Sequence, residues 1–307
     1  MAKIETFTIP SKHDGLELSV TTVVPEGRIA GLVQFSHGMA EHKERYLPAM
    51  EFLAEHGYGC VINDHRGHGA SVRTPDDLGY FYKDGGRGLI KDLHQITLWF
   101  RGKYPGKPLV LFGHSMGSLA ARAYAAKYGR DIDGLILSGS PGFNSAAPMG
   151  LVLTRVLAIV HRTQHARSRL MDAILNGGFS KRFKGGSKFA WLSANGENVR
   201  KYESDPLCGF GFTLNGYRAL LNLMLAAYDE KTSVRRSLPV FFMSGEDDPC
   251  APDRKGFDSA MENLRQRGCV DVTGKMYPGL RHEILNESVQ EVYDDLLAAV
   301  ERMALKR

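Results

Sequence analysis

The stretch of sequence that decides the fold is PLVLFGHSMG, residues 108–117. Its first five residues form an apolar run of strand length, and the alanine-rich run that follows at 118–123 indicates a helix. The pattern Gly-x-Ser-x-Gly between them is weak by itself in a glycine-rich chain, but a strand before it and a helix after it give the sharp turn that exposes a nucleophilic serine. Gly113 and Gly117 suit this turn because it leaves no room for β-carbons. We therefore expect Ser115 at a helix N-terminus, where backbone N–H groups can meet a negatively charged oxygen.

A serine hydroxyl needs a base to become a nucleophile, and the candidate base is His282. It lies in YPGLRHE, residues 277–283, on a loop between the last predicted strand and a terminal helix. Among the eleven histidines it is the only plausible base that completes the chain order Ser, Asp, His.

The acid that orients this histidine is expected after the preceding strand. The run LPVFFMSG, residues 238–245, is followed by three carboxylates, Glu246, Asp247 and Asp248. We favour Asp248 because the proline after it stiffens the loop, and Asp247 stays as the alternative.

A second turn that follows a strand, QFSHGMAEH at residues 34–42, can supply part of an oxyanion hole. A His-Gly turn at this point can place the backbone N–H of Met39 opposite that of Met116, which provides two donors. The two methionine side chains are expected to line the pocket.

Short apolar runs alternate with longer helical patterns along the chain, which predicts a mostly parallel sheet with helices on both faces. The expected strands are Glu17–Val24, Leu32–Ser36, Gly59–Asp64, Leu109–Phe112, Leu135–Ser138, Val240–Ser244 and Val272–Tyr277, with Ile4–Ile9 as an antiparallel edge beside the first of them. The expected helices are Tyr46–His56, Leu89–Lys103, Met116–Tyr128, Asp253–Arg267 and Glu283–Met303.

One stretch, residues 141–212, interrupts the alternation with amphipathic helical pieces and has no convincing buried strand. We interpret it as a helical cap inserted into an α/β core formed by residues 1–140 and 213–307. The apolar run Leu151–Val160 is expected to cover an acyl channel.

The cap is strongly basic. Between Gly150 and Ala190 only Asp172 opposes eight basic residues, Arg155, Arg162, Arg167, Arg169, Lys181, Arg182, Lys184 and Lys188. A helix that is apolar on one side and basic on another can rest on an anionic membrane surface. The alternative, a cap helix that packs on the core with a solvated basic face, is the one that the sequence favours.

Composition narrows the classes of function. The 307 residues are 43% hydrophobic and 24% charged, with a net charge of +5 that is too small to argue for nucleic acid. Four dispersed cysteines, Cys60, Cys208, Cys250 and Cys269, have neither Cys-x-x-Cys nor metal-type histidine spacing, so we expect free thiols and no metal. No stretch has signal-peptide or spanning character, so we expect a cytoplasmic protein, and the sequence makes no prediction of its oligomeric state.

With these residues identified, the chain resembles the monoacylglycerol lipase/lysophospholipase group of α/β-hydrolases. The motifs that carry the resemblance are HGMAEH at 37–42, DHRGHGAS at 64–71, GHSMG at 113–117, GEDDP at 245–249 and RHE at 281–283. The resemblance implies an α/β-hydrolase fold and a Ser115–Asp248–His282 triad, with the acid three residues after the glycine of Gly-x-x-Asp. It also implies oxyanion donors at Met39 and Met116, no cofactor, and hydrolysis of a small-molecule ester that carries one acyl chain. We interpret the loop at residues 64–71 as structural.

Two other functions stay open on this scaffold. An aminopeptidase of the same fold would have to neutralise the substrate ammonium with acidic cap residues, and this cap is basic. A non-catalytic binding protein would need none of the three triad residues. Acyl transfer to another alcohol would use the same triad.

Overall fold

The central sheet of the protein has eight strands in the described part of the chain. The computed structural model describes residues 2–175, 177–183, 185–251 and 254–305, so two residues named above, Lys184 and Asp253, lie outside it. The strands are β1 (Ala2–Pro10), β2 (Glu17–Pro25), β3 (Gly31–Ser36), β4 (Tyr58–Asn63), β5 (Leu109–His114), β6 (Gly134–Ser138), β7 (Val240–Gly245) and β8 (Val272–Tyr277).

The strands follow the order β1-β2-β4-β3-β5-β6-β7-β8. Strand β2 runs antiparallel to both of its neighbours, and all other neighbouring pairs are parallel. The predicted mostly parallel sheet with an antiparallel edge is therefore confirmed. Because parallel strands end at the same edge of a sheet, Ser115 after β5, the loop after β3, and the loops after β7 and β8 all meet at one edge.

The helices are α1 (Leu47–Glu55), α2 (Gly85–Lys103), α3 (Met116–Tyr128), α4 (Ala147–Val160), α5 (Arg169–Leu175), α6 (Gly196–Ser204), α7 (Leu214–Ala227), α8 (Arg254–Gln266) and α9 (Gln290–Leu305). Short 3-10 turns cover Lys43–Tyr46, Pro75–Asp77, Ser180–Arg182 and Ile284–Asn286.

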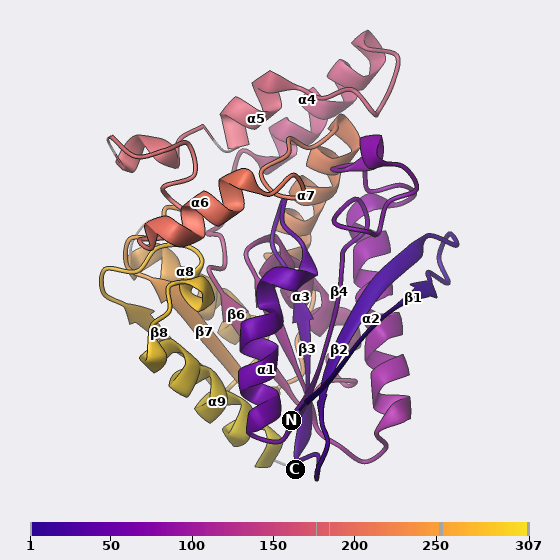
Figure 1. Ribbon diagram of the computed structural model, residues 1–307. Helices are drawn as coiled ribbons and strands as arrows, with labels where there is room; N and C mark the ends of the chain where they lie inside the picture. The colour runs from indigo at the N-terminus through magenta and orange to yellow at the C-terminus, as the bar shows by residue number, and fades with distance from the viewer. Residues whose placement is uncertain (1, 176, 184, 252–253, 306–307) are drawn as a thin grey trace.

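Two apolar cores lie on opposite faces of the sheet, and successive residues of β5 alternate between them. Leu109 and Leu111 belong to the core under α2, α3, α7 and α8, whereas Val110 and Phe112 belong to the core under α1 and α9. Successive side chains of a strand point to opposite faces, so a central strand covered on both faces must be apolar throughout. This is why the run at 108–112 is continuous rather than alternating. Figure 1 shows the helices on both faces of the sheet.

The structure adds one helix to those expected and shifts the start of two others. Helix α7 (Leu214–Ala227) was not expected at all, and it packs against α2, α3 and α4. Helix α2 begins at Gly85 rather than Leu89, and the terminal helix α9 begins at Gln290 rather than Glu283. A 3-10 turn, Ile284–Asn286, occupies part of the interval between His282 and α9.

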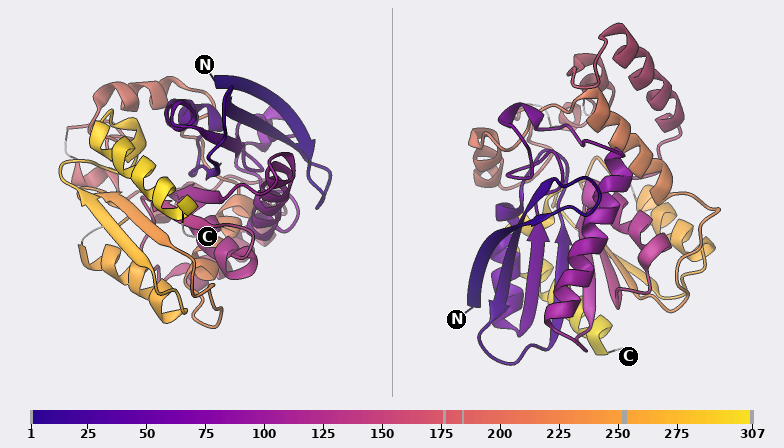
Figure 2. Two further views of the ribbon diagram at one scale, coloured as in Figure 1. Left: turned by 90° about the horizontal axis from the view of Figure 1, so that it is seen from below. Right: turned by 90° about the vertical axis from the view of Figure 1, so that its right-hand side faces the viewer.

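The segment between β6 and α7 holds α4, α5 and α6 above the edge of the sheet where the strands end. The right-hand view of Figure 2 shows α4 at the top of the molecule, far from both chain termini. In the described residues, no helix has the length and apolarity needed to cross a bilayer.

Candidate active site

Ser115 occupies a strained turn between β5 and α3. Its backbone has φ 52° and ψ −120°, a conformation that a non-glycine residue adopts only when its surroundings enforce it. Its N–H donates to the carbonyl of Ser138 in β6 at 2.9 Å, which anchors the turn to the neighbouring strand. A β-carbon on Gly117 would lie 2.0 Å from the carbonyl oxygen of Ser36, so this glycine lets α3 start directly against the end of β3. The expected strand, turn and helix around the serine are present.

His282 and Asp248 form a buried pair beside this turn. The Nδ1 atom of His282 lies 3.0 Å from one carboxylate oxygen of Asp248 and 2.9 Å from the other. The Asp248 side chain is completely buried and that of His282 is 2% exposed, whereas Asp247 is exposed. Of the two aspartates that the sequence left open, Asp248 is the one in contact with the histidine.

The loop after β7 holds the Asp248 carboxylate in place. One oxygen accepts a hydrogen bond from the N–H of Cys250 at 2.8 Å, and the other accepts one from the hydroxyl of Ser244 at 3.2 Å. Burial disfavours the charged form of both members of the pair. The attraction between the two charges outweighs the effect of burial, so the pKa of His282 is raised and that of Asp248 is lowered. Cys250 also contributes to the raised pKa of His282.

Gly139, at the end of β6, is a further residue of the site that sequence reasoning missed. Its φ is 52°, and a β-carbon there would lie 3.0 Å from the Nδ1 atom of His282. The glycine therefore provides the space for the imidazole. The neighbouring ring of His114 is also buried, and burial together with the proximity of His282 lowers its pKa to about 3.

The turn after β3 lies against the serine. A β-carbon on Gly38 would be 3.2 Å from the β-carbon of Ser115, so the two backbones are close neighbours. The Gly38 N–H donates to a carboxylate oxygen of Glu41 at 2.5 Å, which fixes the shape of this turn. Met39 and Met116 both line the same cavity as Ser115 and His282, as the sequence predicted for the two methionines.

A largely buried arginine, with its side chain 11% exposed, connects this turn to the histidine loop. Arg45 Nη1 donates to Glu41 at 2.8 Å and to Glu283 at 2.6 Å, and its Nη2 donates to Glu283 at 2.6 Å and to Asn198 of α6 at 3.1 Å. Burial raises the pKa of Glu41, whereas Arg45 overcomes burial at Glu283 and lowers its pKa to about 2. The guanidinium of Arg45 therefore links the motif at 37–42 to the RHE motif at 281–283. The spacing of these motifs in the sequence does not reveal this link.

The cavity above Ser115 has a volume of about 670 Å³. Its wall is largely apolar and aromatic and combines core residues with residues of the segment 141–212; these include Leu119, Phe143, Leu175, Phe179, Phe189, Trp191, Leu192, Phe210, Leu220 and Met224. The expectation that Leu151–Val160 would cover the channel is wrong, because none of these residues is part of the wall. Helix α4 packs its inner face on α7 instead and turns its outer face to solvent.

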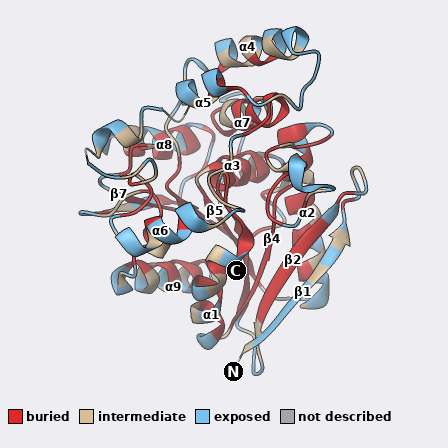
Figure 3. Cartoon of the chain, turned by 45° about the horizontal axis from the view of Figure 1, so that its top comes forward, coloured by how far each residue is buried: buried red, intermediate tan, exposed pale blue. Residues whose placement is uncertain are grey.

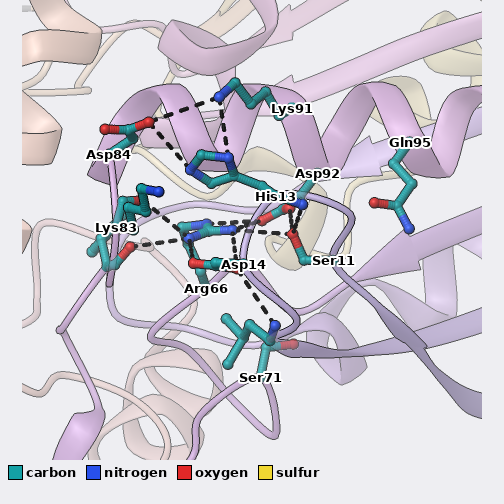
Figure 4. Close-up of polar contacts among 12 residues, drawn as sticks. Ser11, His13, Asp14, Arg66, Ser71, Lys83, Asp84, Lys91, Asp92 and Gln95 are labelled. Carbon is teal, nitrogen blue, oxygen red and sulfur yellow. Dashed lines mark hydrogen bonds and ion pairs between the residues drawn. The ribbon is translucent and has the colours of Figure 1, made fainter.

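The loop at residues 64–71 is tied into the core by its arginine. Arg66 is fully buried and pairs with Asp14 at 2.9 Å and with Asp92 at 2.7 Å, and Ser71 accepts a hydrogen bond from the N–H of Ser19 at 2.9 Å. Figure 4 shows the guanidinium between these two aspartates. These contacts join the loop to the N-terminal hairpin and to α2, which fits the structural role expected for it.

Comparison with known proteins gives a consistent result. Residues 27–289 match the family model described as serine aminopeptidase, S33. The monoacylglycerol lipase of Mycolicibacterium smegmatis is 27% identical over 92% of this chain and 92% of its own length, and the monoglyceride lipase of Rattus norvegicus is 30% identical over 92% and 85%. A thermostable carboxyl esterase from Bacillus coagulans, solved in complex with glycerol, superposes with a TM-score of 0.90 at 27% identity and covers 99% of this chain and 100% of that one. The chain therefore belongs to the serine aminopeptidase S33 family of α/β-hydrolases, and within it to the monoacylglycerol lipase-like group of carboxylic ester hydrolases.

Proposed function

We propose that this enzyme hydrolyses esters that carry a single acyl chain, of the monoacylglycerol or lysophospholipid type, with Ser115, His282 and Asp248 as its catalytic triad. The observation that carries the proposal is the contact of His282 Nδ1 with both oxygens of the buried Asp248, at 2.9 and 3.0 Å, beside a serine held in a strained turn.

The chemistry follows from the two nitrogens of His282. Since Nδ1–H is held by Asp248, Nε2 is free of its proton and can accept the one from the Ser115 hydroxyl as its oxygen attacks the ester carbonyl. The tetrahedral intermediate collapses to an acyl-enzyme, and the imidazolium gives the proton to the departing alcohol. A water molecule then attacks the acyl-enzyme with His282 again as base, which releases the carboxylic acid and restores the serine.

The backbone N–H groups of Met39 and Met116 are proposed to stabilise the oxyanion of both tetrahedral intermediates. Two observations support this: Met116 is the first residue of α3, and the turn that carries Met39 lies against the β-carbon of Ser115 through Gly38. Preorganised donors of this kind are usually the largest electrostatic contribution to acyl transfer.

The cavity supports an acyl ester rather than a peptide N-terminus. An aminopeptidase has to neutralise an ammonium group, but two of the carboxylates in the wall, Glu41 and Glu283, are already paired with Arg45. Another carboxylate of the wall, Asp172, accepts a hydrogen bond from the hydroxyl of Tyr217 at 3.2 Å. The apolar and aromatic remainder of the wall is suited to a hydrocarbon chain.

Residues 141–212 are proposed to act as the cap that selects the substrate, inserted between the core segments 1–140 and 213–307. Its support is that Phe179, Phe189 and Trp191 of this segment form part of the cavity wall above Ser115. Acyl-chain preference should therefore respond to substitutions at these positions.

The test is a series of nitrophenyl esters of increasing chain length, run beside monoacylglycerols, lysophospholipids and aminoacyl anilides. Hydrolysis of the single-chain esters with no turnover of the anilides is expected. Preferential turnover of the anilides would refute the ester assignment in favour of the peptidase.

We also propose that the outer face of α4 and α5 docks on anionic lipid surfaces. The exposed apolar side chains on this face are Met149, Val152, Val156, Ile159, Val160, Leu170 and Ile174, with Met149 77% and Ile159 76% exposed. Exposed Arg155, Arg162 and Arg169 accompany them, whereas Arg167 donates to the carbonyl of Leu78 at 2.9 Å. Figure 3 shows α4 exposed along its outer side. The sequence favoured a cap helix that packs on the core with a solvated basic face. The exposed apolar side chains of this outer face favour contact with a membrane surface instead.

Two variants and a control test the docking. Replacement of Arg155, Arg162 and Arg169 by glutamine should weaken binding to phosphatidylserine vesicles by about 10²-fold at low salt, because each arginine contributes about 1 kcal/mol. Met149→Ser combined with Ile159→Ser should weaken binding at high salt as well. The control is Val270→Ser, which changes an apolar side chain that is 62% exposed but lies outside the cap.

All of these variants should hydrolyse a short soluble ester at the wild-type rate. Equal vesicle binding by the wild type and both cap variants would refute the docking surface while leaving the triad assignment untouched.

A further inference from the structure

His42 lies in a second cluster of chemically reactive side chains, outside the triad. The residue follows the turn that carries Met39, and it faces the loop after α6. One imidazole nitrogen, a carboxylate oxygen of Asp205 and the Sγ atom of Cys208 lie within 4.8 Å of one another. His42 is 7% exposed, and Asp205 and Cys208 are half-buried, so the cluster lies mostly below the surface at the junction between core and cap.

The two nitrogens of His42 have different partners. Nε2 lies 2.8 Å from Asp205, and Nδ1 lies 2.6 Å from a carboxylate oxygen of Glu44. In histidine metal sites, the nitrogen that does not bind the ion usually donates to a carboxylate or carbonyl, which orients the ring. Glu44 occupies this position for an ion held by Nε2.

The loop after α6 presents its two donors in a fixed turn. One oxygen of Asp205 accepts a hydrogen bond from the N–H of Leu207 at 2.8 Å, and the carbonyl of Asp205 accepts one from the N–H of Cys208 at 3.0 Å. This Asp-x-x-Cys spacing brings a carboxylate and a thiol to the same point, as Cys-x-x-Cys does with two thiols in zinc sites.

From this arrangement we propose that His42, Asp205 and Cys208 form a zinc-binding site, with Glu44 as the carboxylate that orients the histidine. Imidazole nitrogen, thiolate sulfur and carboxylate oxygen are all ordinary ligands of Zn²⁺, and three such protein ligands leave one position for water. The sequence predicted no metal because His42 is separated from Asp205 by 163 positions.

Hydrogen bonds hold the same side chains together before any ion binds. His42 lies 2.8 Å from Asp205 and 2.6 Å from Glu44, and its ring is within 4.8 Å of the Cys208 sulfur. Zinc would therefore bind at a site whose ligands are already close to one another, rather than assembling the ligands from a distance.

An ion at this site would join the oxyanion turn to the cap. The carbonyl of Ala40 already accepts hydrogen bonds from the N–H of Gly209 at 2.9 Å and from the hydroxyl of Tyr202 at 2.8 Å. Because Ala40 follows Met39 directly, a metal bridge from His42 to Cys208 would tighten this junction. It would raise the thermal stability of the whole enzyme without touching Ser115.

The triad region offers a competing set of donors, Asp248, Cys250 and His282, whose ligand atoms also lie within 4.8 Å of one another. Zinc at that position would remove the base from catalysis and inhibit the enzyme. The experiment therefore has to separate binding through Cys208 from binding through Cys250, and these two cysteines provide matched variants.

The test is a titration of the untagged, metal-free, reduced enzyme with Co²⁺ as a spectroscopic substitute for Zn²⁺, followed by displacement with Zn²⁺. In the wild type and in Cys250→Ala, one equivalent should produce the thiolate-to-cobalt charge-transfer band and the visible absorption of a four-coordinate ion. Cys208→Ala should lose the band, and Asp205→Asn should bind cobalt more weakly. Zinc should raise the melting temperature of the wild type and of Cys250→Ala but not of Cys208→Ala.

Two results would overturn the proposal. The first is absence of the band at millimolar cobalt, which would leave His42 as an imidazolium between two carboxylates. The second is loss of the band in Cys250→Ala, which would place the ion at the triad. If Cys208→Ala fails to fold, the spectrum of Cys250→Ala still decides between the two cysteines.

Discussion

Replacement of Asp248 by asparagine tests the triad assignment most directly, because the structure dictates which way the new amide must face. One oxygen of Asp248 accepts the N–H of Cys250 at 2.8 Å, and a backbone N–H cannot reverse its role. The other oxygen faces the hydroxyl of Ser244 at 3.2 Å, which can turn from donor to acceptor. The asparagine oxygen therefore stays with Cys250, and its NH2 group occupies the position facing Ser244.

This orientation presents an N–H donor to Nδ1 of His282, where the native enzyme has an acceptor 2.9 Å away. Only the oxygen 3.0 Å away can then still accept from Nδ1–H, whereas the NH2 group at the closer position favours the tautomer with its proton on Nε2, the nitrogen that should take the proton of Ser115. In a serine protease of known mechanism, the equivalent substitution stabilises the wrong tautomer and lowers kcat by about 10⁴-fold. We expect a loss of about 10³- to 10⁴-fold here, which corresponds to about 4–5.5 kcal/mol in activation free energy.

The assay is steady-state hydrolysis of a short soluble nitrophenyl ester, with circular dichroism and thermal melting to confirm that the variants are folded. Asp247→Asn is the matched control, because that side chain is exposed and its substitution should change kcat by less than about twofold. If Asp248→Asn keeps kcat within tenfold of the wild type, or if Asp247→Asn has the larger effect, the orientation argument and the acid assignment are both wrong.

Three further predictions follow from the site. Ser115→Ala should abolish ester hydrolysis and labelling by a fluorophosphonate probe. The double variant Ser115→Ala with His282→Ala should be no slower than either single variant, because the two residues act as a unit. Additive losses in kcat would show that they act independently. Asp248 raises the pKa of His282, and the neutral imidazole is the active form, so kcat/KM should fall with decreasing pH through a pKa above the ordinary 6.5. Asp248→Asn should move this acidic limb of the pH–rate profile to lower pH. An acidic limb at higher pH in the variant would contradict the prediction. In urea titrations, Gly117→Ala should lower the free energy of unfolding by about 3 kcal/mol, because the new β-carbon would lie 2.0 Å from a carbonyl oxygen. Gly27→Ala is the control: its new β-carbon would have no atom within 4 Å, so the free energy of unfolding should change by less than about 0.5 kcal/mol.

Much of the fold was predictable from local patterns. The apolar run before Ser115 predicted a central strand because both faces of that strand are covered, and periodicity located most of the helices around it. Helix α7 was missed because it follows a segment without strands and its buried residues, which include Asn215 and Gly216, do not form a simple apolar stripe.

The sequence by itself determined the chemical types at the candidate site and their order along the chain, because each candidate follows a strand that parallel pairing brings to one edge of the sheet. Only the tertiary structure decided between Asp247 and Asp248, since the two are adjacent in sequence and differ in which one the loop turns inward to His282. Tertiary packing also decided which cap residues line the cavity: helix α4 has apolar side chains on two sides, and α7 could bury only one of them. The sequence likewise could not predict the link from Arg45 to Glu283 or the cluster at His42. Each joins residues from distant segments, and their proximity depends on how the chain returns to the same edge of the sheet.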